Sequence, residues 1–207
     1  MAIDKEFMHF IQIQPSEGFA VSKNYLINIP KKQIIDKRNG KRLPYDMESK
    51  ILVYEDRQKT WFFDIADALK KNNEAGFVIL MIASAYLESN QQYREGSSSN
   101  GNSTSYINKA LERIFPKMTS DEKEIFVKGV RCGLFHDGIT KKGVFINASQ
   151  QNIFLSDLAE GTLEVNPHKF LESTKQDFKE YIKLLKDTQN MQERDNFETM
   201  WNSQKGI

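Results

Sequence analysis

The segment from Glu74 to Arg94 restricts the possible folds most strongly, because it is apolar around most of a helix. Its apolar positions recur every three or four residues, as they do along one face of an α-helix. The main stripe comprises Phe77, Leu80, Met81, Ser84 and Leu87, and the residues that widen it are Ile79, Ile82 and Ala83. A helix of this kind is stable in water only when other helices cover it. We therefore predict a mainly α protein, an antiparallel helical bundle with this helix at its centre.

The amino-terminal region is expected to form a small β element. Residues 19–29 are rich in β-branched and aromatic side chains, which predicts a strand. Within residues 34–43, Asn39 and Gly40 supply the two positive-φ positions of a type I′ turn, which predicts a hairpin. Residues 50–54 predict one more strand.

Helices are expected on both sides of the central one. The first spans about residues 57–71, and another spans about residues 106–115 and is closed by Pro116. Residues 96–105 contain no apolar side chain, so we expect a mobile loop there. This loop joins two helices that pack together, and we therefore do not place a domain boundary in it.

The helix with the clearest start signal follows. Thr119, with Glu122 three residues later, matches a capping box, and Gly138 matches a helix stop. Gly129 and Gly133 would allow a neighbouring helix to approach closely. The sequence therefore predicts one helix from about Thr119 to about Gly138.

The last part of the bundle combines a short hairpin with a long helix. Residues 143–146 and 152–155 predict the two strands of the hairpin. Asn166 and Pro167 match the first positions of a helix that continues to about Lys186.

The chain beyond this helix is polar. Phe197, Met200 and Trp201 would share one face if the segment is helical, so it either docks on a partner or frays. The predicted organisation is a β-rich element over residues 1–55, a helical bundle over residues 56–187 and a polar tail over residues 188–207.

Composition excludes several classes of function. The 207 residues carry a formal net charge of +1, so any binding of nucleic acid requires a local patch. Cys132 is the only cysteine, which excludes an intramolecular disulfide and a multi-cysteine zinc site. The three histidines stand in no ligand-like spacing, so we expect no metal and no cofactor.

Association with a membrane is not expected. The longest apolar stretch, from Ala75 to Leu87, is shorter than the roughly 18 residues needed to cross a bilayer. The first residues are acidic where a signal peptide is basic. We therefore expect a soluble, cytoplasmic protein.

Residues 130–138 carry the best candidates for chemistry. Arg131 stands five positions before His136, near the end of the helix predicted from about Thr119 to about Gly138, which we call the motif helix. An arginine, four residues and a histidine at this place in a helical bundle resembles the HEPN superfamily, whose defining motif is Arg, four to six residues, His. The resemblance covers roughly residues 74–186. Active members often have Asn or Asp directly after the arginine, where this chain has Cys132.

The resemblance implies a homodimeric, metal-independent endoribonuclease in a bacterial defence, toxin–antitoxin or stress setting, with RNA as substrate and an antitoxin or other protein as partner. Arg131 would stabilise negative charge on the phosphate, and His136 would move protons or hold the phosphate. The RNA 2′-hydroxyl would attack, which leaves 2′,3′-cyclic phosphate ends. Glu88, Cys132 and Asp137 are candidate supporting residues, and Glu88 is expected to orient Arg131.

The spacing of the pair favours two copies of the chain. Residues five apart are about 140° apart around an α-helix, because each residue advances about 100°. One α-helix therefore does not aim Arg131 and His136 at the same phosphate. The family solves this by dimerising, so we expect a homodimer with a composite cleft and with Gly129 and Gly133 near a close helix contact.

Each candidate also has a purely structural interpretation. Arg131 can pair with a surface carboxylate, and His136 can cap the helix end. Cys132 can be a small buried side chain rather than a thiolate nucleophile, and Glu88 can be solvated. The alternative function is a non-catalytic HEPN-like dimer that binds RNA, a nucleotide or a protein. A third is an interaction scaffold that uses Trp201 in the tail.

Positive charge gathers in one predicted turn. The basic residues there are Lys31, Lys32, Lys37, Arg38, Lys41 and Arg42. A charged hairpin tip serves solubility and edge protection, or it contacts a phosphate backbone. The candidates for such nucleic-acid binding are Lys37, Arg38, Lys41 and Arg42.

Overall fold

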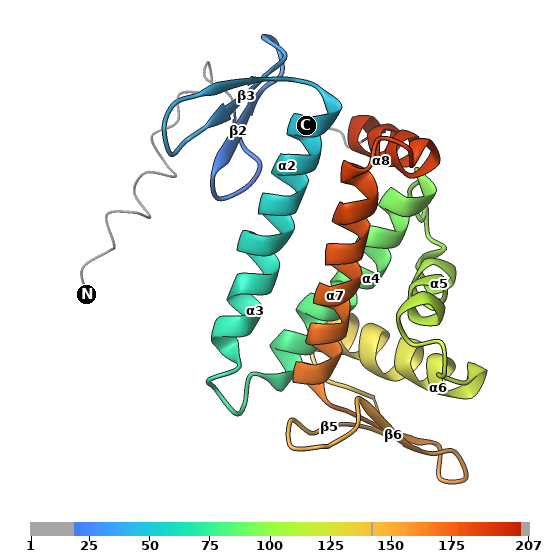
Figure 1. Ribbon diagram of the computed structural model, residues 1–207. Coiled ribbons are helices and arrows are strands. Elements are labelled where there is room, and N and C mark those ends of the chain that lie inside the picture. The colour runs from blue at the N-terminus through green and yellow to red at the C-terminus, as the bar shows by residue number, and fades with distance from the viewer. Residues whose placement is uncertain (1–18, 142, 204–207) are drawn as a thin grey trace, which may run out of the picture. The chain divides into compact units, whose positions relative to one another are not determined.

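The computed structural model describes residues 19–141 and 143–203 (Figure 1). These residues form two compact units, one of residues 19–62 with 201–203 and the other of residues 63–200. Most of the described structure is helical, which confirms the prediction of a mainly α protein. No helix in the two described ranges is both long enough and apolar enough to span a membrane.

The first unit contains an antiparallel sheet in the order β1-β2-β3-β4. Its strands are β1 (Phe19–Ala20), β2 (Tyr25–Asn28), β3 (Gln33–Asp36) and β4 (Arg42–Pro44). The predicted single strand over residues 19–29 is wrong, because residues 21–24 bend and fold β1 back on β2. The side chain of Ser22 explains part of this bend, since its hydroxyl accepts the Tyr25 N–H at 3.2 Å.

The predicted hairpin over residues 34–43 is present as β3 and β4, but its turn is not type I′. Gly40 has a positive φ of 71°, whereas Asn39 does not. The Gly40 N–H donates to the Asp36 carbonyl at 2.8 Å, so the turn is longer than two residues. A single left-handed position, filled by glycine, is sufficient for a turn of this length.

Residues 50–54 form part of a helix rather than the predicted strand. Helix α2 (Met47–Gln58) begins at Asp46, whose side chain accepts the Ser49 N–H at 2.9 Å. Ile51, Tyr54 and Gln58 are buried at helical spacing. The short apolar run over residues 50–54 is compatible with a strand or a helix, and the Asp46 cap before it favours the helix. The π-helical segment η1 (Lys59–Phe63) and helix α3 (Asp64–Leu69) follow.

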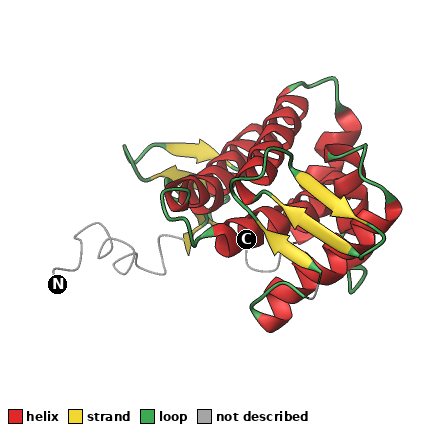
Figure 2. Cartoon of the chain, turned by 90° about the horizontal axis from the view of Figure 1, so that it is seen from below, coloured by secondary structure: helices red, strands yellow, loops and turns green. Residues whose placement is uncertain are grey.

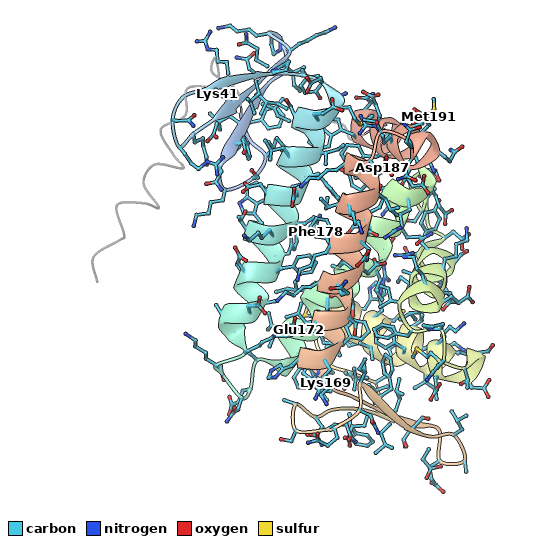
Figure 3. The ribbon with its side chains drawn as sticks, viewed as in Figure 1. Lys41, Lys169, Glu172, Phe178, Asp187 and Met191 are labelled. Atoms are coloured by element: carbon cyan, nitrogen blue, oxygen red, sulfur yellow. The ribbon has the colours of Figure 1, made fainter. Side chains whose placement is uncertain are left out.

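The second unit is built around α4 (Gly76–Glu95), which packs against α5 (Ser103–Ile114) and α7 (Pro167–Lys186), as Figure 1 shows. Ile79, Leu80, Ala83 and Leu87 are completely buried, as predicted for a central helix. Phe178, labelled on α7 in Figure 3, lies with its ring centroid 5.5 Å from that of Phe63. This apolar core fixes α4, from which one half of the candidate site projects.

A small sheet follows the motif helix, in the order β5-β7-β6 (Figure 2). Its strands are β5 (Val144–Ile146), β6 (Phe154–Asp157) and β7 (Thr162–Val165). The predicted pairing of residues 143–146 with 152–155 is wrong, because β7 lies between the two strands and pairs parallel with β5. Gly161, with a φ of 63°, makes the turn that returns β7 beside β6.

The predicted polar tail is a helix with a buried face. Helix α8 (Met191–Ser203) contains Phe197 and Trp201, and both side chains are completely buried within the chain. Phe197 stacks on Tyr93, with ring centroids 5.3 Å apart. The tail therefore neither frays nor presents Trp201 for docking, and the scaffold hypothesis loses the feature on which it depended.

Candidate active site

The motif helix changes its hydrogen-bonding pattern along its length. The Thr119 hydroxyl accepts the Glu122 N–H at 3.2 Å, which confirms the capping box. After the short α6 (Ser120–Ile125), the chain continues as two π-helical segments, η2 (Phe126–Arg131) and η3 (Gly133–Asp137). Gly138 ends the helix with a φ of 72°, as predicted.

This π-helical geometry brings Arg131 and His136 together. In a π-helix, the i to i+5 hydrogen bond places residues five apart on successive turns of the same side. Nη1 of Arg131 lies 3.4 Å from Nε2 of His136. The prediction that the two side chains diverge by about 140° is wrong, because it assumed an α-helix. A guanidinium has only donors, so this contact requires Nε2 of His136 to accept.

Glu88 on α4 holds the arginine from the opposite side. Its Oε2 accepts from Nη2 of Arg131 at 3.1 Å, so the expected ion pair is present. The side chains are 22% exposed for Arg131 and 19% for Glu88, which shields the pair from much of the solvent. Glu88 therefore fixes the guanidinium without burying it.

Two serines hold Glu88 in turn. Oε1 of Glu88 accepts the hydroxyl protons of Ser99 at 2.8 Å and Ser103 at 2.6 Å. Partial burial by itself raises the pKa of Glu88, but the hydrogen bonds from Ser103, Ser99 and Arg131 outweigh it and hold the pKa below its ordinary value. The carboxylate is thus kept charged.

These contacts attach the segment over residues 96–105 to α4. It was predicted as a mobile loop because it has no apolar side chain, yet hydroxyl groups attach it to α4. Helix α5 begins at Ser103, three residues earlier than predicted. The hydroxyls of Ser97 and Tyr106 lie 2.7 Å apart, which ties the start of the segment to α5.

A cavity of about 210 Å³ opens beside the pair. Its lining residues are Ser84, Ala85, Glu88, Ser89, Gln92, Arg131 and Phe135. The Phe135 side chain is 43% exposed, and its ring centroid lies 5.6 Å from Cζ of Arg131. The charged pair of Arg131 and Glu88 therefore borders a hollow that also has apolar and neutral polar walls.

Cys132 and Asp137 make other contacts. Cys132 lines a second cavity, of about 380 Å³, together with Thr104, Asn108 and Lys128. The Asp137 carboxylate lies 3.6 Å from Nζ of Lys141 and is half exposed. Neither residue has a recorded contact with Arg131 or His136 within the described part of the chain.

Gly129 and Gly133 do allow close approach, but to the chain's own backbone and β5 rather than to another helix. A Cβ on Gly129 would lie 2.3 Å from Cγ2 of Val144, and one on Gly133 would lie 2.5 Å from the Ile139 carbonyl oxygen. The expectation that these glycines lie on a helix contact between two subunits is therefore wrong. Their space is filled by the segment that leads into β5.

The basic hairpin belongs to the first unit, where Figure 3 labels Lys41. Arg38 is engaged within the hairpin, since its Nη2 donates to Asp36 at 2.7 Å and to the Tyr25 hydroxyl at 2.8 Å. Lys41 and Arg42 are exposed, and Lys37 is half-buried. Of the four proposed phosphate contacts, Arg38 thus has a structural role in the hairpin turn.

The sequence did not identify four residues of the site, namely Ser84 and Gln92, which line the cavity, and Ser99 and Ser103, which bind Glu88. The serines of the polar segment carried no signal, because hydrogen bonds between distant residues leave no periodicity. In residues 19–141 and 143–203, no three His, Cys, Asp or Glu side chains gather as metal ligands.

Comparison of the chain with protein-family models, with curated proteins and with solved structures found no match. A fixed guanidinium and an imidazole within hydrogen-bonding reach can bind one phosphate and move a proton beside it.

Proposed function

We propose that the chain is a HEPN-like helical bundle that works as a homodimeric, metal-independent endoribonuclease. The observation that carries this proposal is the contact of Arg131 with His136, together with the Glu88 carboxylate that orients the arginine. Arg131 and Glu88 border a hollow, in which Arg131 can contact a phosphate.

The reaction follows from the groups present. The 2′-hydroxyl of a ribose attacks the adjacent phosphorus, and the bond from phosphorus to the 5′-oxygen of the next nucleotide breaks. Arg131 stabilises the negative charge that grows on the phosphate oxygens. His136 transfers a proton to or from the reacting oxygens, or holds the phosphate. The products carry a 2′,3′-cyclic phosphate and a free 5′-hydroxyl.

A second candidate function is a non-catalytic dimer that binds RNA, a nucleotide or a protein. The observation that favours it is the charge balance of the site, because Glu88 already neutralises Arg131. Cys132 after the arginine points the same way, since active members of the HEPN superfamily often have Asn or Asp there.

The purified chain should be incubated with mixed RNA in the presence of a chelator of divalent metals. We expect cleavage with cyclic phosphate ends, and loss of cleavage in Arg131→Ala and His136→Ala. Lys128→Ala is the matched control, because Lys128 is an exposed cation on the same helix. Cleavage that survives in both variants of the pair would refute the assignment, and RNA binding without cleavage would favour the second candidate.

A further inference from the structure

The small sheet of the second unit carries exposed apolar side chains on its outer face, the face turned away from the helices. Figure 2 shows this sheet in front of the helices of that unit. Val144, Leu163 and Val165 point toward the helices and are buried. Successive side chains of a strand alternate between the two faces, so Phe145 on β5 and Leu155 on β6 point outward. They are 57% and 51% exposed, and neighbouring exposed apolar side chains mark an interaction surface.

A carboxylate lies between these two side chains. Glu164 on β7 is the cross-strand partner of Phe145 on one side and of Leu155 on the other. Adjacent strands are about 4.8 Å apart, so the three side chains form one row across the outer face. Oε1 of Glu164 accepts from the side-chain amides of Asn147 at 3.0 Å and Gln150 at 2.9 Å. The carboxylate is thus held in place, and its Oε2 has no recorded partner in the part of the chain that the structure describes.

The sheet and its connecting loops are acidic. Residues 143–165 contain no lysine, arginine or histidine. Their acidic residues are Asp157, Glu160 and Glu164. The recorded contact of Lys169 with this region is at the Gln151 carbonyl, in the loop between β5 and β6. A cationic partner is therefore attracted to the sheet, whereas a polyanion such as RNA is repelled.

The size of the outer face suits a short segment rather than a folded domain. Strands β5, β6 and β7 contain three, four and four residues. With about 3.4 Å per residue and about 4.8 Å between strands, their outer face covers on the order of 200 Å². A stable interface between folded proteins buries roughly 800 Å² of each partner. This face is therefore too small to hold a second copy of the chain by itself.

We propose that the outer face of the small sheet is a docking surface for a short segment of another protein, in which a basic residue stands between apolar residues. The basic group pairs with Oε2 of Glu164 and lies against the ring of Phe145, whose face attracts a cation. The apolar residues of the segment pack on Phe145 and Leu155. This inference does not rest on the proposed function, because neither Arg131 nor His136 takes part in it.

A library of random dodecapeptides displayed on phage supplies the probe for the whole chain. We expect the enriched peptides to carry an arginine or lysine between large apolar residues. One enriched peptide is then synthesised with arginine at that position and with citrulline, which has nearly the same shape without the charge. Fluorescence anisotropy should show about tenfold tighter binding of the arginine peptide.

Glu164→Gln completes a double-mutant cycle with these two peptides. Glutamine keeps an oxygen that can accept from Asn147 and Gln150, but it carries no charge. We therefore expect this variant to bind the arginine and citrulline peptides with equal affinity. A structural role of Glu164 alone would leave the preference for arginine unchanged.

The apolar part of the surface is tested at its two exposed side chains. Phe145→Thr and Leu155→Thr should each weaken binding of the arginine peptide about tenfold. Their melting temperatures should stay close to that of the wild type, because threonine also favours strands. Met191→Thr, at the exposed methionine labelled on α8 in Figure 3, should leave the affinity unchanged.

Three results would overturn the docking surface: no enriched peptides, enriched peptides without a basic residue, or a preference for arginine that Glu164→Gln retains. Loss of the dimer in light scattering of Phe145→Thr would do so as well, since the face would then be a contact between copies. The proposed function is measured separately, by cleavage of RNA. Its failure would leave peptide binding intact, and failure of peptide binding would leave cleavage intact.

Discussion

At the scale of single residues, the site depends on a carboxylate that is itself held in place. Glu88 accepts hydrogen bonds from Ser99, Ser103 and Arg131 at distances between 2.6 and 3.1 Å. Each of these bonds favours the charged carboxylate. The two serines are therefore positioning residues, because they act on Arg131 only through Glu88.

Replacing both serines by alanine should shift the pH dependence of cleavage. Without their hydrogen bonds the pKa of Glu88 rises, because burial remains and two groups that favour the charge are lost. Glu88 then takes up a proton at a higher pH and releases Arg131. We expect about tenfold slower cleavage and an acid limb of the pH–rate profile that begins at higher pH.

The profile should be recorded for the double variant Ser99→Ala/Ser103→Ala and for Ser98→Ala. Ser98 lies in the same segment, and its recorded contact within the described residues is through its backbone carbonyl. The control should retain the wild-type profile. A double variant with lower activity but the same acid limb would contradict the positioning role.

Cleavage is expected to require the planar guanidinium group of Arg131 as well as its positive charge. One guanidinium nitrogen faces His136 and the other faces Glu88, a pair of contacts that a lysine ammonium does not reproduce. Arg131→Lys should therefore lower the cleavage rate by about 100-fold while preserving most of the binding to RNA. Wild-type activity in this variant would show that charge alone is sufficient.

At the scale of elements, the π-helical segments decide how the motif is presented. Such segments are rare, and they occur frequently at functional sites. Val144 of β5 lies directly over Gly129, and the backbone of residues 139–141 lies over Gly133, so a side chain at either glycine would collide with them. The motif helix and the small sheet therefore support each other.

Gly129→Ala should destabilise the chain by about 1–3 kcal/mol, because the new methyl group would overlap Val144. The free energy of unfolding can be measured in urea. Val144→Ala removes Cγ2 of Val144, the atom that the new methyl group would overlap. The double variant Gly129→Ala/Val144→Ala should therefore lose less stability than the sum of the losses of the two single variants. Strict additivity would contradict the predicted overlap.

The caps explain which elements the sequence could predict. Thr119 with Glu122, and Asn166 with Pro167, mark helix starts through contacts within a few residues, and both starts were predicted correctly. The change from α to π geometry after Ile125 has no such local signal. Strand β7 is no shorter than β5 and β6, and it was missed because its place depends on pairing with both of them.

The candidate site was also predictable from the sequence only in part. Arg131, His136 and Glu88 could be named from the sequence, and the structure places them in contact. The contact between Arg131 and His136 could not be predicted from the sequence, because the expected separation of about 140° holds only for an α-helix. Ser99 and Ser103 act on Glu88 from another element, and a polar composition does not show which hydroxyls meet a carboxylate.

At the scale of the whole molecule, one buried ionic cluster joins three helices of the second unit. Asp177 on α7 accepts from Nε of Arg113 on α5 at 2.9 Å and from Nη2 of Arg94 on α4 at 3.2 Å. It also accepts the Tyr86 hydroxyl proton at 2.6 Å. Burial by itself raises the pKa of Asp177, but Arg113, Arg94 and Tyr86 together hold it below its ordinary value.

Asp177→Asn should lower the free energy of unfolding by about 3 kcal/mol at pH 7, because two partly buried arginines lose their counter-charge. A carboxyl whose pKa is lowered by folding stabilises the native state above its unfolded-state pKa. The difference between wild type and variant should therefore shrink as the pH falls below about 4. Urea unfolding at pH 7 and pH 3 measures it, and a difference independent of pH would contradict this role.

The proposed enzyme should be a dimer in solution. Light scattering coupled to size exclusion at micromolar concentration should give twice the 24.0 kDa mass of the chain. A monomer under these conditions would remove the composite cleft. Since the two π-helical segments of one chain already bring Arg131 to His136, cleavage by a monomer would show that a single copy is sufficient.

The π-helical turn also makes the site unusually sensitive to the length of the chain. Removing one residue between Arg131 and His136 would return the backbone to the tighter winding and rotate the imidazole by about 100° relative to the guanidinium. Conservative replacements on the buried face of the helix leave this winding unchanged, whereas a deletion in the interval changes the side of the helix that carries His136. Deletions, rather than substitutions, are therefore the changes that would most readily separate the pair.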